Sequence, residues 1–546
     1  MSSNNINGRD PIRKESNMTH TPAMNRIIRV LQRARNQNLL ATGKPGSKSK
    51  ISQSRRQILK SSAMSMAALA AGASLSACRS GSQHPIVIVG AGLAGLTAGY
   101  YLAKLGLKAP IYEARGRVGG RIRTLHNVLA PGLDTDLGGE LINSDHEDML
   151  TLAQDLGLSL TNRLEPNPDL DKVGYYFNGY RRSEAEIAEA LRPLAQQIMT
   201  DSELLDSDWD TYAPLFEKQS LTEYLDQHRA LLTSDPDVRY LIESTVRVEY
   251  GVEAQDSSAI QLLYLLPVID GDHVDLLSTS DEAFVLNGGS ETLTTKLGEL
   301  LNDHIHLHSP LTKIAKSGQG YELTFNHIHK VKANYVILAL PFTTLRQVEI
   351  KLDFPHKLTR FINEVDLGRN EKLIASVKGR PWQQQQGFEI EAWSDQSVSL
   401  IWDGSLRQPE LEDAALTFFL SADEVAEYAQ GTPQEQGEKL LAEYEALIPG
   451  LMGASNHSYR RTAWHKTRYI GGGYTNFKPG QYTELAQDWL YIEADDPDER
   501  QFFHFENVVF AGEHTSDEYY GFMNGAAQSG RLAAELISEM ESNKAI

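Results

Sequence analysis

The sequence predicts an α/β protein. Its main domain is a doubly wound Rossmann-type sheet assembled from non-contiguous segments, and a mixed α+β domain lies beside it. Three observations predict this fold. The apolar run Ile86–Val89 leads directly into the glycine-rich turn Gly90–Gly95 and then into a helical stretch. A second apolar run ends in an acid, Glu113, eighteen residues after the turn. A third run, 335–341, has the composition of a buried parallel strand that returns to the same sheet.

The glycine-rich turn carries the first chemical signal. Gly90, Gly92 and Gly95 together permit a tight turn, let the backbone approach a pyrophosphate, and allow the helix to pack on the strand. The N-terminus of that helix offers amide donors to the phosphates. Glu113 is placed to accept hydrogen bonds from an adenosine ribose. The turn, helix, second strand and acid therefore predict a dinucleotide-binding domain.

The charge of the chain is unevenly distributed. Residues 1–78 hold 13 Lys and Arg against 2 Asp and Glu, so the remainder carries 39 basic and 70 acidic residues, a net charge of −31. A body this acidic repels nucleic acid and anionic membranes, which excludes binding to a phosphate backbone. It attracts cations, protonated amines among them. We therefore expect a small-molecule partner and no nucleic acid.

The first seventy-eight residues predict export. Residues 1–53 are basic, polar and without apolar periodicity, which is typical of disorder. Residues 54–78 join a twin-arginine motif to a short uncharged run with small residues at its end, which is typical of a twin-arginine signal peptide. The run ends at Cys78, the only cysteine, in a pattern that resembles a lipoprotein box. The mature protein would be periplasmic or anchored to the membrane through lipidated Cys78, unless cleavage at a nearby site removes that residue's role.

The segment after Glu113, Ala114 to Arg121, resembles the flavin amine oxidase family through its Arg-x-x-x-Gly-Gly-Arg pattern. Further matches at 136–140, 286–290, 508–514 and 521–526 extend the resemblance over about residues 84–540, and a helix is expected to follow from Ala527. It implies FAD as the cofactor. The residues that it implies for FAD binding are Gly90, Gly92, Gly95, Glu113, Ala114, Arg115, Gly120, Arg121, Gly139, Glu140, Leu311, Glu513 and Met523.

The resemblance also implies catalytic residues. In the related monoamine oxidases a cysteine forms a thioether to the flavin, and this chain has Gly473 there, so FAD is expected to be non-covalent. Tyr474 and Phe522 match the two aromatic side chains that face each other across the substrate amine. Lys372 matches a lysine that holds a water beside the reactive flavin nitrogen and assists the reaction with oxygen. Trp464 matches a tryptophan near the flavin.

The same resemblance divides the chain into domains. We assign 84–145, 281–349 and 461–540 to the FAD-binding domain, and 146–280 and 350–460 to the substrate-binding domain. The segments of the substrate-binding domain show helical periodicity. On weaker evidence, we expect four of their residues to line the pocket: Arg247, Glu249, Tyr250 and Tyr264. The alternation of His304, His306 and His308 lacks carboxylates at ligand spacing, so no metal site is expected.

The leading functional prediction is oxidative deamination of a primary amine or amino acid by oxygen, which gives an imine, then a carbonyl and ammonia, and hydrogen peroxide. An L-amino-acid oxidase is the first alternative. It needs a cation for the carboxylate, and Leu141 stands where venom-type enzymes carry an arginine, although Arg163, Arg247 or Arg369 could serve. A flavin desaturase or isomerase on the same fold is the second alternative. The sequence leaves the oligomeric state open, with a homodimer among the options.

Overall fold

The predicted first strand, Ile86–Val89, is strand β1 of the computed structural model. The structure describes residues 86–544, except for 166–168, 234, 278–279, 385–386 and 495–498. The predicted disordered segment 1–53, the predicted signal at 54–78 and its Cys78 lie outside the described residues.

The glycine turn belongs to a six-stranded sheet built from distant parts of the chain. Its first five strands are parallel and its last is antiparallel. This arrangement confirms the predicted doubly wound fold. In spatial order the strands are β11 (Ile305–His306), β2 (Ile111–Tyr112), β1 (Ile86–Val89), β15 (Tyr335–Leu338), β25 (Val508–Phe510) and β24 (His504–Phe505).

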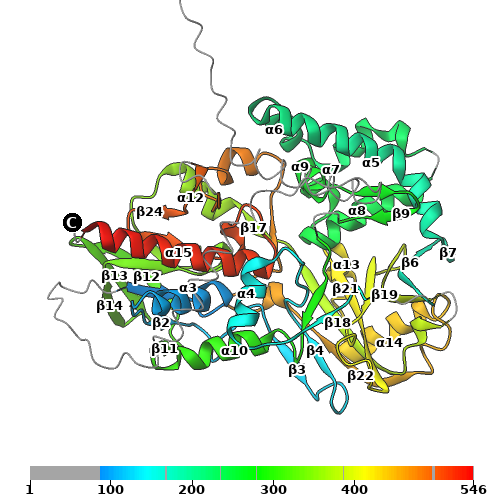
Figure 1. Cartoon of the computed structure of the whole chain (residues 1–546), viewed down its shortest axis with the longest axis horizontal. Coiled ribbons are helices and arrows are strands. Elements are labelled where there is room, and N and C mark those ends of the chain that lie inside the picture. Colours follow the sequence, from blue (N-terminus) through cyan, green and yellow to red (C-terminus); the bar gives the residue numbers. More distant parts are fainter. Residues whose placement is uncertain are drawn as a thin grey trace, which may run out of the picture.

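Two helices pack closely on one face of this sheet: α3 (Leu93–Lys104) and α15 (Met523–Lys544), which lie side by side in Figure 1. Their backbones meet at Gly530, where an added Cβ would lie 2.3 Å from the carbonyl oxygen of Ala94. The expected start of the last helix, at Ala527, is wrong by four residues, because the helix already begins at Met523. The sequence predicts that Gly525 precedes the helix, but it lies within α15.

The other side of the six-stranded sheet contacts a smaller sheet. Phe325 stacks on Tyr112 of β2 with ring centroids 4.1 Å apart. Such aromatic contacts hold the two sheets together. The smaller sheet consists of β14 (His329–Ala333), β13 (Gly320–Phe325), β12 (Leu311–Ser317) and β16 (Glu349–Lys351). Helix α10 (Glu291–Leu300) packs against α3.

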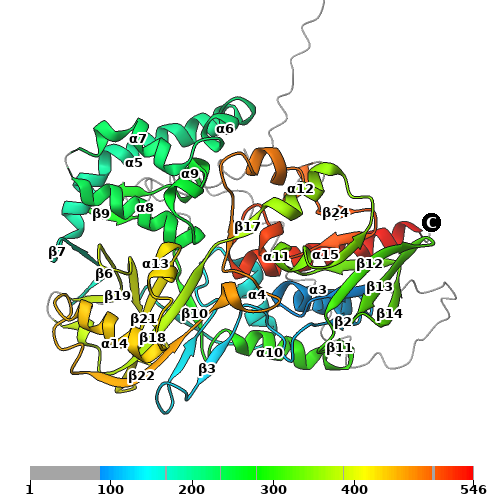
Figure 2. The ribbon, with the colours of Figure 1, turned by 180° about the vertical axis from the view of Figure 1, so that it is seen from behind.

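A second lobe is built around a seven-stranded sheet, which lies apart from the first sheet in both views (Figures 1 and 2). Neighbouring strands are antiparallel except for the parallel pair β19 and β6. In order they are β22 (Ser455–Arg461), β18 (Asn370–Lys378), β21 (Asp413–Ser421), β20 (Leu400–Asp403), β19 (Phe388–Ser394), β6 (Asp171–Phe177) and β7 (Tyr180–Arg182). Helix α14 (Pro433–Tyr444) covers one face, above a core that includes Trp382 and Phe418.

A cluster of helices stands at one end of the second sheet (Figure 2). Its members are α5 (Glu184–Ser207), α6 (Trp209–Glu217), α7 (Leu221–Gln227), α8 (Pro236–Tyr250) and α9 (Ala259–Leu265). The sequence sets their limits. Ser183 and Glu186 form a capping box at the start of α5, and Gly251 ends α8 with a left-handed φ of 66°.

The remaining strands and α-helices are short. They are β3 (Thr124–His126) with β4 (Asp134–Asp136), β5 (Leu160–Asn162) with β10 (Phe284–Leu286), β8 (Val268–Asp270) with β9 (His273–Asp275), β17 (Asp366–Leu367) with β23 (Thr475–Asn476), and helices α4 (Glu147–Asp155), α11 (Phe342–Leu345), α12 (His356–Glu364) and α13 (Asp423–Glu427). Helix α4, which falls in the range assigned to the substrate-binding domain, contacts α15 through the ion pair of Asp148 with Arg531. Among the described residues, none of the helices has the length and apolar character needed to span a bilayer.

Candidate active site

A cavity of about 500 Å³ runs along the carboxyl ends of β1 and β2 and continues to the start of α15. In open α/β sheets ligands bind at this edge. Most residues predicted to bind the cofactor line it: Gly90, Gly92, Glu113, Ala114, Arg115, Gly120, Arg121, Gly139, Leu311, Glu513 and Met523. Gly95 and Glu140 do not, and each has a different structural role.

The three glycines of the turn have different structural roles. Gly90 has a φ of +102°, which favours glycine, and its missing side chain lets Ala339, the residue after β15, approach. At Gly95 an added Cβ would lie 1.9 Å from the carbonyl oxygen of Gly90, so this residue serves the packing of helix on turn. Gly92 faces open space, is the N-cap of α3 and has no side-chain cap. The first-turn amides of α3 thus remain available to an anion in the cavity.

Glu113 holds the turn in shape. One carboxylate oxygen accepts a hydrogen bond from the amide of Ala91 and the other from the amide of Arg115, both at 2.8 Å. Burial raises the pKa of Glu113, while these two amide bonds oppose that change. A carboxylate keeps further acceptor capacity after two hydrogen bonds. Its position in the cavity wall therefore still suits a hydroxyl donor such as a ribose.

Arg115 and Arg121 differ in their surroundings. The Arg115 Nη1 atom is buried and has no hydrogen-bond partner among the described residues, although its side chain lines the cavity. An unsatisfied buried donor of this kind is costly, and a diphosphate is the ligand that guanidinium groups satisfy well. Arg121 is already paired, because its Nη1 donates to Glu513 at 2.8 Å and also to the carbonyl of Gly473.

Glu513 anchors the end of the cavity nearest α15. Besides Arg121 it accepts hydrogen bonds from the Thr475 hydroxyl at 3.0 Å and from the Gly521 amide at 2.7 Å. Burial alone would raise the pKa of Glu513, but Arg121 and the other partners outweigh it and the pKa is lowered. The charged carboxylate therefore fixes the segment 521–523 next to the cavity.

A second cavity, of about 110 Å³, adjoins the first. The two share Gly139, Tyr474, Gly521, Phe522 and Met523 in their walls. The seven-stranded sheet supplies Trp393, Trp402, Phe419 and Glu391, and helix α8 supplies Glu249. Arg163, next to β5, and Glu282, before β10, add two further ionisable side chains. Tyr474 and Phe522 thus stand at the junction, where the sequence placed the substrate amine.

Lys372 lies at the same junction within a buried ion cluster. Its Nζ contacts the carboxylate of Glu140 at 2.6 Å and the carbonyl oxygens of Gly138 at 2.9 Å and Asp136 at 3.1 Å. These three oxygens use all three hydrogens of the ammonium group. The expected role of Lys372 in the reaction with oxygen stays a prediction.

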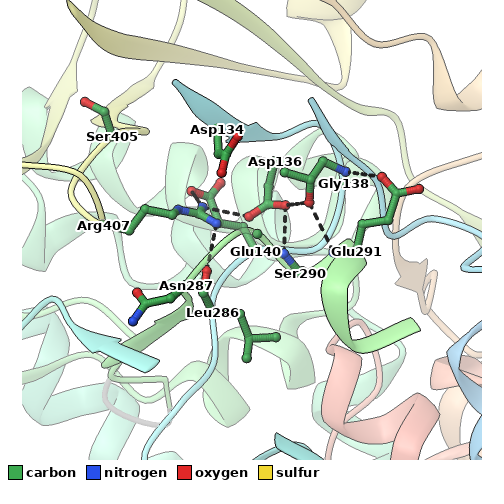
Figure 3. Close-up of polar contacts among 12 residues, drawn as sticks. Asp134, Asp136, Gly138, Glu140, Leu286, Asn287, Ser290, Glu291, Ser405 and Arg407 are labelled. Carbon is green, nitrogen blue, oxygen red and sulfur yellow. Dashed lines mark hydrogen bonds and ion pairs between the residues drawn. The ribbon is translucent and has the colours of Figure 1, made fainter. Parts of the chain in front are cut away.

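Arg407 completes this cluster (Figure 3). Its Nη2 contacts Asp136 at 2.6 Å and Glu140 at 3.2 Å, and its Nη1 donates to the carbonyl of Leu286 at 3.0 Å. Asp136 also accepts hydrogen bonds from Thr124 and from the amide of Ser290. Burial would lower the pKa of Arg407, but the two carboxylates outweigh it and raise the pKa. The cluster of Lys372, Arg407, Asp136 and Glu140 is therefore balanced, with two charges of each sign.

Trp464 lies beside this cluster. Its indole Nε1 donates to the carbonyl of Leu137 at 3.1 Å, and its ring lines a small cavity of about 30 Å³ together with Lys372, Gly473 and Tyr474. The structure thus brings Trp464 together with Lys372 and Tyr474, whereas Phe522 lies with those two residues in the wall of the second cavity.

Sequence reasoning missed part of this site. Of the four weaker candidates only Glu249 lines the second cavity; Arg247, for example, pairs with Glu253 at 3.0 Å. Arg407, Glu282, Glu391 and the aromatic walls were not found, because no local motif surrounds them. Among the described residues there is no group of three His, Cys, Asp or Glu side chains suited to a metal ion.

A comparison with models of known protein families identifies the family of this chain. Residues 93–538 match the family model of the flavin containing amine oxidoreductases. The chain belongs to this family. It is an oxidoreductase that acts on amines, and FAD is its cofactor. The residues present fit FAD, because the open Gly92, the unsatisfied Arg115 and the first turn of α3 offer what its diphosphate requires.

Curated relatives and solved structures agree with this membership. Flavin-containing amine oxidase B of Canis lupus familiaris is 27% identical over 473 residues, which cover 83% of this chain and 85% of that protein. The human enzyme is 27% identical over 467 residues, with the same coverage. The structure of putrescine oxidase bound to putrescine matches with a TM-score of 0.67 and 20% identity, covering 83% of this chain and 99% of that one. Cyclohexylamine oxidase from Brevibacterium oxydans IH-35A matches with a TM-score of 0.67 and 21% identity, covering 84% and 100%.

Replacing Arg407 by Met should destabilise the protein by about 3–5 kcal/mol, because Asp136 and Glu140 would remain buried with too little positive charge. Arg239 of α8, which forms partly exposed pairs with Asp226 and Glu243, provides the control. Arg239→Met should cost about 1 kcal/mol or less. Urea denaturation of both variants measures the difference, and equal losses would show that the cluster is not a structural requirement.

FAD should leave the protein on acid denaturation, because Gly473 stands at the attachment position and the only cysteine is Cys78. We expect all of the yellow colour in the supernatant after precipitation with acid. Absorbance of the supernatant and of the redissolved pellet measures the partition. Flavin that stays with the pellet would contradict non-covalent binding.

Proposed function

We propose that this protein catalyses the oxidative deamination of a primary amine with oxygen as the electron acceptor. The observation that supports it most is the junction of the two cavities, where Tyr474 and Phe522 stand between the cofactor cavity and a cavity with aromatic walls. When bound, FAD would supply the acceptor for a hydride equivalent from the carbon that bears the amine nitrogen, with oxygen as the final oxidant and hydrogen peroxide as its product. The resulting imine takes up water and yields a carbonyl compound and ammonia.

The protein's own residues would bind and orient the amine. The aromatic rings around the junction exclude water and restrict the approach of the substrate, and alignment of this kind can lower a barrier by several kcal/mol. The faces of Tyr474 and Phe522 also favour a partly positive nitrogen. Putrescine oxidase and cyclohexylamine oxidase, which share the fold, act on amines according to their names. Their likeness supports an amine substrate for this chain as well.

An L-amino-acid oxidase is the second candidate function. We call the second cavity the substrate cavity. Arg163 lines it and, apart from Lys372, is the positively charged side chain in its described wall, which favours this candidate. Against it, Arg163 Nη1 already donates to the backbone and side chain of Glu282, and Leu141 supplies no charge. A peroxide-coupled assay of the FAD-loaded protein with primary amines and with amino acids separates the two. The proposed function fails if neither class reduces the flavin or forms peroxide.

Tyr474→Ala should keep FAD and its visible spectrum while the rate of anaerobic flavin reduction by the amine falls at least about tenfold. The reason is that the substrate loses one of the two walls that orient it. Tyr474→Phe is the matched control and should lose much less, since the Tyr474 hydroxyl has no hydrogen bond to any described residue. Stopped-flow absorbance measures both rates. An unchanged rate of flavin reduction in Tyr474→Ala would show that Tyr474 does not orient the substrate.

We also propose that the enzyme is exported by the twin-arginine route and anchored by a lipid on Cys78, on the evidence of residues 54–78 alone. Export of the folded protein would let FAD bind before transport. Intact-mass and peptide mass spectrometry of the mature protein should find a lipidated Cys78 at the N-terminus. An unmodified N-terminus at another residue would contradict the anchor, and export that survives Arg55→Lys with Arg56→Lys would contradict the route.

A further inference from the structure

The wall of the substrate cavity holds more acidic side chains than the cations beside them can pair. The cluster at Lys372 has no net charge, because two cations, Lys372 and Arg407, pair with two carboxylates, Asp136 and Glu140. Outside that cluster the cavity wall holds three carboxylates, those of Glu249, Glu282 and Glu391, and one cation, Arg163. Burying unpaired charge is expensive, so an excess of two carboxylates needs an explanation.

Glu249 is the strongest sign of a ligand. It makes no hydrogen bond or ion pair with any other described residue, and burial together with the neighbouring Glu282 raises its pKa to about 8. It also lies in the last turn of α8, whose dipole disfavours a negative charge at that end. Neither packing nor helix stability accounts for a carboxylate here. A cation in the cavity does.

Glu282 and Glu391 face the same space. Glu282 is held in a left-handed conformation with a φ of 45°, and its carboxylate accepts from Arg163 Nη1 at 3.3 Å. Glu391 accepts from the indole of Trp393 at 3.1 Å. Burial raises the pKa of both carboxyl groups, and Arg163 opposes that effect at both. One arginine is thus shared between two glutamates, and Glu249 has none.

The wall also contains donors that the protein leaves unsatisfied. Arg163 Nη2 and the indole Nε1 of Trp402 are buried and have no hydrogen-bond partner among the described residues. The side chain of Arg163 is 3% exposed and Trp402 is 5% exposed, so bulk water does not serve them. Buried polar atoms in native proteins nearly always have partners. Orphaned donors and an unpaired carboxylate in one cavity indicate that a polar ligand completes it.

We propose that the substrate carries a second cationic group, at the end of its carbon chain away from the reacting amine, and that Glu249 binds this group with the support of Glu282 and Glu391. The proposal rests on the proposed function, because the reacting amine occupies the junction at Tyr474 and Phe522. The indole faces of Trp393 and Trp402 suit the same cation. A free diamine and a basic amino acid share this chemistry. They differ in a carboxylate, for which Arg163 Nη2 and Trp402 Nε1 are the available donors.

Four compounds with one carbon skeleton test the proposal. Pentylamine and 1,5-diaminopentane differ only in the distal ammonium group, and so do norleucine and lysine. Each amino acid becomes the matching amine when its carboxylate is removed. We expect the distal ammonium to raise kcat/KM at least about tenfold within the pair that the enzyme accepts, since hydrogen bonds between charged groups are the strong ones. Preference for lysine over 1,5-diaminopentane would identify a basic amino acid, and the reverse a free diamine.

Variants of Glu249 connect the preference to the residue. Glu249→Gln keeps the size of the side chain and should lower kcat/KM for the dication, relative to kcat/KM for the monocation, at least about tenfold, mostly through KM. Glu243→Gln, on the same helix but paired with Arg239 outside the cavity, is the control and should change neither. Both variants should keep the flavin spectrum.

The outcomes separate this inference from the proposed function. Equal turnover of monocation and dication, or a dication preference that survives in Glu249→Gln, would overturn the inference and leave amine oxidation standing. The inference also fails if benzylamine is oxidised while all four compounds are not. Failure of every amine and amino acid to reduce the flavin would instead overturn the proposed function.

Discussion

Four buried charges tie the two lobes of this protein together. Asp136 ends strand β4 and Glu140 follows in the segment that contributes Gly139 to the cofactor cavity, whereas Lys372 lies on β18 and Arg407 between β20 and β21 of the second lobe. Each ion has an oppositely charged neighbour within 3.2 Å, and further hydrogen bonds to Thr124, Ser290 and Leu286 satisfy the rest. A buried ion is tolerated only when its partner is in place, so the lobes have little freedom to separate here. The junction of the two cavities is built on this constraint.

The ionisable side chains around the site fall into two groups: a cluster whose charges cancel, and glutamates that lack enough cations to pair with. The cluster at Lys372 holds the segment 138–140 in position and cancels its own field. The glutamates of the substrate cavity do not cancel, because Arg163 is their only nearby counter-ion in the cavity wall that the structure describes. The first group therefore positions the walls at which cofactor and substrate meet, and the second remains available to select the substrate.

Most of the cofactor site could be predicted from the sequence, since it is built from short local patterns. The turn from Gly90 to Gly95 encodes its own geometry through positive φ and close backbone approach, and Glu113 needs only the length of one helix and one strand to reach it. The prediction failed where local signals conflict. Gly525 suggested a loop, yet α15 begins at Met523, because packing on α3 outweighs the low helix propensity of one glycine.

The sequence by itself determined the fold class through neighbouring residues with fixed spacing, and the resemblance of its motifs to the flavin amine oxidase family implied the cofactor and the residues at the junction. Only the tertiary structure decided which charges meet. Arg407 stands 267 positions from Glu140, and Glu249, Glu282 and Glu391 come from a helix, a loop and a strand with no common motif. Electrostatic interactions act through space, and burial lowers the dielectric constant around them. Their partners therefore become known only when the chain has folded.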